Sequence, residues 1–232
     1  HQLLDEAFAG LGTPAYLYTP PAVFPGGANA YQQKAEQEYP YGFDERRPGE
    51  ARELMEENGH SEDDPYQLLY THHNDRQVDA NRAQANLIRD QLQAVHIDVE
   101  IEQVPFSTVI DRAIEGSLET FTLGNGLDYP EAQDTLRFAW PSEGNFSNWE
   151  GTEATEAATQ AWDQVINNPG PSEAETEARN EAYIQLEENS WEDIPDILLR
   201  HPIEIVFWRD GVDYRTPTSP FHRPQYNTVQ LE

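Results

Sequence analysis

The sequence predicts an α/β fold built on an open, mainly parallel sheet flanked by helices. Three segments between residues 66 and 124 are typical of strands, and the two amphipathic segments between them are typical of helices. Each intervening segment is long enough to cross over and bring the next strand back in the same direction. The βαβαβ order therefore favours one parallel sheet, with any ligand site outside the carboxyl ends of its strands.

The residues before this sheet are predicted to lead into it. Residues 1–8 are typical of the middle of a helix. Three prolines and two glycines between residues 16 and 27 predict an extended segment followed by a turn, which suits a crossover between lobes. After a polar loop, a helix is predicted over residues 44–58. Its signals are the N-cap Asp44, the apolar stripe of Ala51, Leu54 and Met55, and the stop at Gly59.

The sheet elements themselves follow in alternation. Residues 66–71 are predicted as a strand, and residues 78–95 as a helix with Arg82 and Arg89 on its wet side. The helix's apolar stripe consists of Ala80, Ala83, Leu87, Leu92 and Val95. Residues 96–104 alternate apolar and polar side chains, which predicts a half-buried strand. Pro105 opens a short helix that runs to residue 114, and residues 119–124 complete the sheet.

The rest of the chain is predicted to be helical and then extended. Residues 152–165 and 172–190 carry apolar residues at helical spacing, and the Pro- and Gly-containing turn at 167–171 separates them. Residues 195–214 are predicted to be extended and to close on the hairpin-type dipeptide Asp210-Gly211.

The charge of the chain excludes one class of function and suggests an environment. Its 232 residues include 43 Asp and Glu against 14 Lys and Arg, a formal net charge of −29. This is not a nucleic-acid binder, because binding a polyphosphate needs a basic footprint. The acids are spread along the chain, which predicts adaptation to high salt, where the Debye length falls to roughly 3 Å. The alternative is a merely acidic protein, or one with a basic partner.

Several site classes have no support in the sequence. There is no cysteine, and no apolar run approaches the roughly 20 residues needed to cross a bilayer. The start lacks a Met and a signal core, so we expect a piece of a longer chain with any export signal or lipid anchor upstream. Adjacent strand residues point to opposite faces, so His72 and His73 are interpreted as a solvated loop pair rather than metal ligands. No motif indicates catalysis or a cofactor.

Four phrases of the chain carry a resemblance. They are residues 41–59 (YGFD followed by ARELMEENG), residues 91–100 (QLQAVHIDVE), residues 124–131 (GNGLDYPE) with 145–149 (NFSNW), and residues 187–197 (EENSWEDIPDI). In this order they resemble the C-terminal half of the family 5 extracellular solute-binding proteins of ABC importers, the oligopeptide, dipeptide and nickel binders. The resemblance implies a periplasmic-binding-protein-like lobe of class II, and so a fragment of a two-lobed protein.

The resemblance also implies how the chain is divided. Residues 1–15 would end a first-lobe helix or hinge, residues 16–200 would form the second ligand-binding lobe, and residues 201–232 would return to the first lobe or hinge. In such proteins two lobes joined by crossover strands close on the ligand.

The predicted binding site is the loop from Gly124 to Tyr129, where the third strand ends. The resemblance implies that Asp128 pairs with a peptide α-amino group; a turn or N-cap aspartate is the alternative. The predicted ligand-binding set is Asp128, Asn125, Gly126, Leu127, Tyr129, Trp149 and Thr122. Asn125 replaces the Trp of many relatives and Thr122 an Arg of some, which favours a smaller or more polar ligand. Aromatic residues such as Tyr129 and Trp149 are more often core.

Taken together, these features predict the substrate-binding component of an ABC importer, which captures peptides or similar small polar solutes outside the cell for a membrane permease. No enzyme activity is predicted. One alternative is an acidic extracellular enzyme of the glycoside hydrolase type, which needs only two carboxylates at a set separation. The other is a cell-surface interaction module, for which Asn145-Phe146-Ser147 offers an N-glycosylation pattern consistent with exposure outside the cell.

Overall fold

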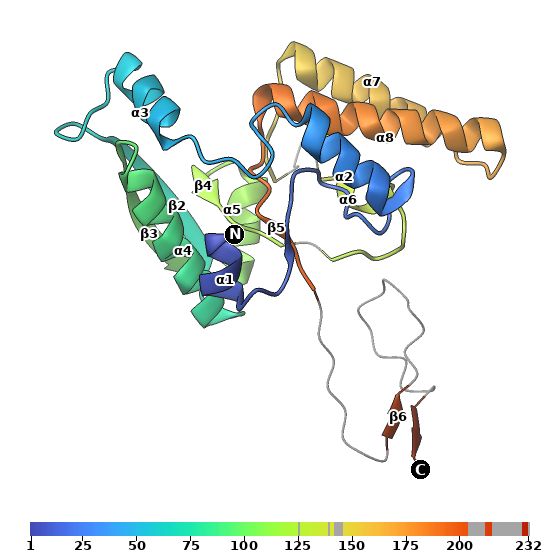
Figure 1. The fold of residues 1–232 in the computed structure, drawn as a ribbon, viewed down its shortest axis with the longest axis horizontal. Helices are drawn as coiled ribbons and strands as arrows, with labels where there is room; N and C mark the ends of the chain where they lie inside the picture. Colours follow the sequence, from blue (N-terminus) through green and yellow to red (C-terminus); the bar gives the residue numbers. More distant parts are fainter. Residues whose placement is uncertain (125, 139, 142–145, 204–211, 215–228, 232) are drawn as a thin grey trace.

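The computed structural model describes the whole chain except residues 125, 139, 142–145, 204–211, 215–228 and 232. The described strands form one three-stranded parallel sheet and two short antiparallel pairs (Figure 1). Helices pack around the sheet, so the predicted α/β fold is confirmed. Among the described helices, none combines the length and the apolar character that a bilayer span requires.

The parallel sheet has the predicted βαβαβ connectivity. It contains β2 (Tyr66–His73), β3 (Ile97–Val104) and β4 (Thr120–Phe121), in the order β3-β2-β4. β2 and β3 pair along their full length, whereas β4 pairs only with Tyr70 and Thr71 of β2. The third strand is therefore shorter than the predicted residues 119–124.

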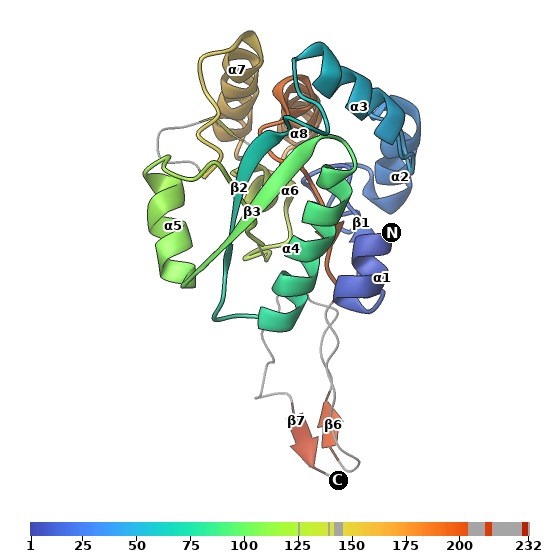
Figure 2. The same ribbon diagram turned by 90° about the vertical axis from the view of Figure 1, so that its left-hand side faces the viewer.

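Two helices cover opposite faces of this sheet (Figure 2). α4 (Val78–Gln93) lies on one face and α5 (Phe106–Ile114) on the other, close to their predicted ranges. The fully buried positions of α4 are Gln84 and Ala85, and Ala85 packs in a core cluster with Tyr70 and Val99. Leu92 and Val95 of the predicted apolar stripe lie in the core as expected, whereas Gln84 and Ala85 take the buried positions in the middle of α4.

The N-terminal segment contains a helix that the sequence did not reveal. After α1 (Gln2–Phe8) and β1 (Thr13–Pro14), α2 (Gly27–Glu38) occupies most of the predicted polar loop. Its buried residues are Tyr31, Lys34 and Ala35, at helical spacing. The inner face of α2 has no continuous apolar stripe because it contains Lys34, the only lysine. The buried side chain of Lys34 is neutralised by Glu38 at 2.6 Å and Glu188 at 2.5 Å.

α3 (Pro48–Glu57) begins later than predicted. Asp44 has a φ of 57° and lies outside the helix, so its predicted role as N-cap is wrong; Arg47 holds that position and Pro48 starts the first turn. Asn58 and Gly59 end the helix as expected. None of its residues is buried, and Leu54 of the predicted apolar stripe is 58% exposed.

The C-terminal half forms a helical layer beside the sheet (Figure 1). It contains α6 (Ala132–Leu136), which was not predicted, and the predicted long helices α7 (Glu153–Asn167) and α8 (Glu173–Asp193). α7 and α8 start at side-chain caps on Thr152 and Ser172. Their shared core includes Leu136, Trp162 and Leu186.

Segments from the two ends of the described chain meet at β1. Thr13 and Pro14 pair antiparallel with β5 (Arg200–His201). The described part of the predicted extended segment 195–214 contains strand only at β5 and at β6 (Val212–Tyr214), which pairs with β7 (Val229–Leu231). The dipeptide Asp210-Gly211 lies outside the described residues.

A buried carboxylate fixes the segment that follows β1. Glu187 of α8 is 1% exposed and accepts the backbone N–H groups of Tyr18 at 2.8 Å and Thr19 at 2.9 Å. Burial raises the pKa of Glu187 to about 7. Nearby, the Tyr31 hydroxyl lies 3.1 Å from His201 Nε2, and burial lowers the pKa of His201 to about 4. The backbone N–H groups of Tyr18 and Thr19 are therefore satisfied by the Glu187 carboxyl group.

Candidate ligand-binding loop

The predicted binding loop runs from the sheet to the helical layer. It leaves β4 at Thr122 and enters α6 at Ala132 (Figure 1). Asp128 and Gly126 are exposed, whereas Leu127 and Tyr129 are half-buried. Asn125 lies outside the described residues. The loop thus leaves the carboxyl end of a parallel strand, where ligands of open α/β sheets bind.

Asp128 combines a fixed backbone with an accessible carboxylate. Its N–H donates to Asp134 Oδ2 at 2.5 Å, and Asp134 is fully buried. Arg137 lies between the two acids, 3.1 Å from Asp128 Oδ2 and 3.2 Å from Asp134 Oδ1. The side chain of Asp128 is 68% exposed, so its carboxylate can accept a further donor. The N-cap of α6 is Glu131, so Asp128 does not cap that helix.

The far end of the loop is anchored to α8. Glu131 Oε1 accepts from the Tyr183 hydroxyl at 3.1 Å and lies 3.4 Å from Arg179 Nε. Burial, reinforced by the Glu131 charge, raises the pKa of Tyr183 above its ordinary value. Burial likewise raises the pKa of Tyr129. These tyrosines are therefore neutral hydrogen-bonding groups at ordinary pH.

Thr122 belongs to a polar network on the α4 face of the sheet. Its hydroxyl lies 2.5 Å from the Tyr70 hydroxyl and accepts from Gln84 Nε2 at 3.2 Å. Gln84 also donates to the Tyr70 hydroxyl at 3.1 Å. The Thr122 hydroxyl is therefore engaged between α4 and the sheet, and its predicted contact with a ligand stays a prediction.

Trp149 lies in the core between the loop and the long helices. It is 7% exposed, packs in the cluster with Leu136 and Trp162, and donates its indole N–H to Asp193 Oδ2 at 2.6 Å. Hydrogen bonds from Thr152 and Trp149 lower the pKa of Asp193. These are the contacts of a packing residue, and a role of Trp149 as a cleft wall stays a prediction.

The two adjacent histidines take different environments. His72 is 2% exposed on the α4 face, and the half-buried His73 packs edge-on against Phe106 of α5. Their opposite orientation follows the expected alternation of a strand, but the expectation of a solvated loop pair is wrong for His72, because β2 extends through both residues. In the described part of the chain, no cluster of three or more His, Asp or Glu is arranged to hold a metal ion.

Three residues that shape the loop could not be recognised from the sequence. Asp134 and Arg137 form the ion-pair chain behind Asp128, and Gln84 anchors Thr122. Gln84 and Asp134 are polar residues at positions that become fully buried, and no periodic pattern indicates such burial. An aspartate six residues after Asp128 is in any case unremarkable in a chain with 43 acids.

Comparison with solved structures identifies the fold. Haemophilus influenzae OppA in complex with RPPGFSPFR matches with a TM-score of 0.64 at 22% identity, over 86% of this chain and 36% of that one. A periplasmic oligopeptide-binding protein of Borrelia burgdorferi matches with a TM-score of 0.68 at 17% identity, over 100% of this chain and 42% of that one. Brucella suis NikA in complex with Fe(III)-EDTA matches with a TM-score of 0.69 at 16% identity, over 100% of this chain and 45% of that one. The chain spans less than half the length of each.

Sequence comparison identifies the family. A search of curated proteins finds no match. The family model for the middle segment of the bacterial extracellular solute-binding proteins, family 5, matches residues 1–147, more than half of the chain. Members of this family, like the solved structures above, are binding proteins rather than enzymes, and the family is extracellular by description. The chain therefore belongs to family 5 of the bacterial extracellular solute-binding proteins.

Proposed function

We propose that this chain is part of the substrate-binding component of an ABC importer. Outside the cell, this component captures peptides or similar small polar solutes and delivers them to a membrane permease. The observation that carries the proposal is the exposed carboxylate of Asp128, whose backbone N–H is held by Asp134 and whose loop is anchored to α8 through Glu131. Family membership supports the binding role, and two of the matched structures are named as peptide complexes.

Residues 16–200 form the second ligand-binding lobe in this proposal. Residues 1–15 lead into it and residues 201–232 return from it. The pairing of β1 with β5 supports this division, because two strands that lie side by side at the edge of a lobe suit a connection between lobes. When two lobes close about a hinge, only a few residues change conformation, and these residues lie in loops or at the ends of helices and strands.

In the proposed complex, Asp128 accepts a charge-assisted hydrogen bond from a ligand ammonium group. The proposed set also contains Gly126, Leu127, Tyr129, Thr122 and Trp149, together with Asn125, which lies outside the described residues. Nothing in this arrangement requires bond chemistry or a cofactor. Calorimetry of the protein with dipeptides, oligopeptides, nickel chelates and sugars tests the ligand class directly.

Replacing Asp128 with alanine is expected to weaken peptide binding by about 10- to 100-fold, since a hydrogen bond to a charged group contributes about 1.5–3 kcal/mol. The measurement is the Kd by calorimetry. Asp163→Ala is the matched control, because Asp163 is an exposed aspartate on α7 away from the loop. Equal affinities of the two variants would remove Asp128 from the site. Saturable binding only to a sugar or a nickel chelate would instead change the ligand class.

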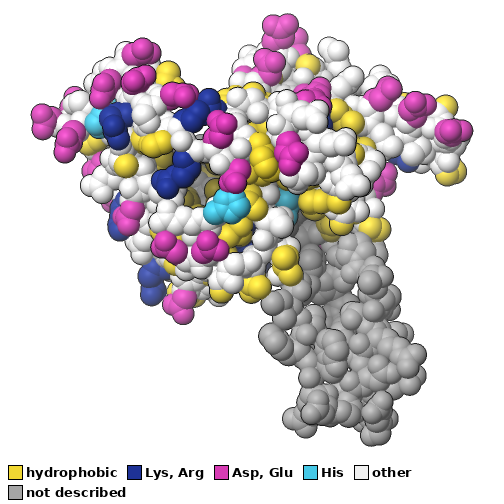
Figure 3. All heavy atoms as spheres, viewed as in Figure 1, with side chains coloured by type: hydrophobic (Ala, Val, Ile, Leu, Met, Phe, Trp, Pro, Cys, Tyr) yellow, Lys and Arg dark blue, Asp and Glu magenta, His cyan; other side chains and the backbone are white. Residues whose placement is uncertain are grey.

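We also propose that the acidic surface is an adaptation to high salt. Figure 3 shows acidic side chains scattered over the sheet-bearing part and over the α7/α8 pair rather than gathered in one patch. Such a surface repels itself in dilute buffer and is screened at high ionic strength.

Raising the KCl concentration from 0.1 M to 2 M is therefore expected to raise the melting temperature by roughly 10 °C. A shift of this size corresponds to the removal of ~3 kcal/mol of repulsion between surface charges. Differential scanning calorimetry measures the shift. Sucrose at matched osmolality is the control, because it stabilises by exclusion without screening charge. A melting temperature that stays constant with salt, or that rises equally with sucrose, would contradict the proposal.

A further inference from the structure

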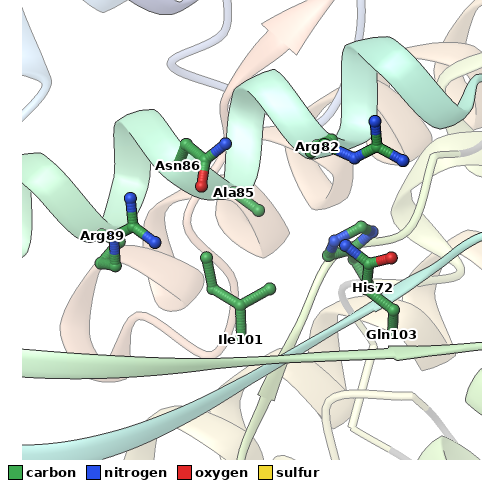
Figure 4. Close-up of a pocket in the computed structure, with 7 residues that line it drawn as sticks. All are labelled: His72, Arg82, Ala85, Asn86, Arg89, Ile101 and Gln103. Atoms are coloured by element: carbon green, nitrogen blue, oxygen red, sulfur yellow. The ribbon is translucent and has the colours of Figure 1, made fainter.

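A pocket lies between α4 and the sheet, and it is distinct from the binding loop described above. Its volume is about 360 Å³, within the range of small-molecule sites and far more than one water occupies (Figure 4). None of the residues from Thr122 to Glu131 lines it. Its polar and apolar lining comes from β2, β3 and α4: His72, Arg82, Asn86, Arg89, Ile101 and Gln103.

The floor of the pocket contains a buried hydrogen-bond acceptor. His72 is 2% exposed, and its Nδ1 lies 3.0 Å from the His73 carbonyl oxygen. A carbonyl oxygen only accepts, so Nδ1 is the donor in this contact, and the tautomer that makes it has a lone pair at Nε2. Nε2 is buried and has no hydrogen-bond partner among the described residues. Leaving such an acceptor unmet costs stability, so the pocket favours a ligand that brings a donor.

The roof of the pocket is basic in a strongly acidic chain. Arg82 and Arg89 are seven residues apart on α4, which places them on one face about 10.5 Å apart along the axis. Their ion-pair partners are the exposed Asp79 at 3.8 Å and Asp90 at 3.2 Å. No acid is among the described residues that line the pocket. The lining of the pocket itself is therefore basic, and the two acids that pair with its arginines lie on the exposed surface of α4.

The two guanidinium groups mark the two ends of the pocket. Figure 4 shows Arg82 above the end that holds His72 and Gln103, and Arg89 above the end that holds Ile101, with Asn86 between them on the helix. A guanidinium matches a carboxylate in geometry and charge. Both arginine side chains are long and partly exposed, so their guanidinium groups can turn toward a ligand that carries one acidic group at each end of a short carbon chain.

We propose that this pocket binds a small hydroxylated dicarboxylate. One carboxylate pairs with Arg82 and the other with Arg89, while a hydroxyl next to the first carboxylate donates to His72 Nε2. Gln103 and Asn86 supply amide groups to the remaining oxygens, and the carbon chain lies against Ile101. The pocket is thus a second solute site on the same lobe, independent of the loop that carries Asp128.

Calorimetry with L-malate, succinate, butyrate and sulfate at one fixed salt concentration tests the proposal. L-Malate is expected to bind saturably, succinate about tenfold more weakly for want of the hydroxyl, and butyrate and sulfate more weakly still. Arg82→Gln and Arg89→Gln are each expected to weaken L-malate binding about tenfold or more. Arg46→Gln, which removes an exposed arginine outside the pocket, is the control and should leave the affinity unchanged.

His72→Leu tests the hydroxyl separately, because it removes the acceptor at Nε2 and should bring the affinities for L-malate and succinate together. Should that buried variant fail to fold, the two arginine variants still decide the case. The proposal is overturned by sulfate binding as tightly as L-malate, by affinities unchanged in both arginine variants, or by no L-malate binding at all. Asp128→Ala should leave L-malate binding intact, so failure of the peptide site and failure of this site are distinguishable.

Discussion

Replacing Gly12 with alanine is expected to lower the free energy of unfolding by about 3 kcal/mol or more, from backbone strain and a steric clash together. Gly12 has a φ of 136°, which favours glycine over any residue with a Cβ. An added Cβ would lie 2.8 Å from the His201 carbonyl oxygen and 3.2 Å from Leu4 Cδ2. The His201 oxygen belongs to the backbone of β5, so relief of the clash requires β1 and β5 to separate.

Urea unfolding followed by circular dichroism measures this loss. Gly49→Ala is the matched control, because Gly49 lies in the first turn of α3, has no positive φ, and would place its Cβ in open space. Alanine there is expected to stabilise by about 0.5–1 kcal/mol through helix propensity. If the two alanine variants unfold at the same urea concentration, the close approach at Gly12 does not constrain the pairing of β1 with β5.

Replacing Glu187 with alanine is expected to cost about 3–4 kcal/mol at pH 5, because two buried backbone donors lose their acceptor and a cavity is left beside α8. The orphaned donors are the N–H groups of Tyr18 and Thr19. Glu181→Ala is the control on the same helix, since Glu181 is exposed. We expect that control to change stability by less than about 0.5 kcal/mol.

The cost of the Glu187 substitution is expected to depend on pH in a defined direction. Burial raises the pKa of Glu187 to about 7, above the value of 4.5 that the unfolded chain has. The folded state therefore holds this proton more tightly, and the stabilisation it gives is complete below pH 4.5 and lost as the pH rises through 7. The difference between wild type and Glu187→Ala should shrink over this range by up to about 3 kcal/mol. A difference that is constant from pH 4.5 to 8 would show that Glu187 is ionised throughout.

The parallel sheet could be predicted because its signals are local. Alternation over residues 96–104 and helical spacing over residues 78–95 reflect which side chains face one core, and β3 and α4 follow them closely. α2 gave no such signal, because a buried lysine occupies its inner face and is neutralised by Glu188 from a distant helix. Long-range charge pairing is invisible to a periodicity argument.

The position of the candidate loop after a strand of the sheet was predictable, but the contacts of its residues were not. Asp128 could be placed at the end of a strand, since chain order and the resemblance both indicate that loop. Its partners Asp134 and Arg137, and the network of Thr122 with Gln84, depend on how α6 and α4 pack. The pocket at His72 was hidden for a related reason: Arg82 and Arg89 lie on the solvent side of α4, as predicted, and only the packing of α4 on β2 and β3 shows that they also border a pocket.

The pairing of Thr13 with His201 has a consequence for how the protein is made. These two residues stand near opposite ends of the described chain, so a nascent polypeptide leaving the ribosome carries β1 long before its partner has been synthesised. The entropy of closing so large a loop rises only with the logarithm of its length, but the search for the partner is slow. β1 therefore stays unpaired until residues 200–201 have been synthesised, later than the strands of the parallel sheet.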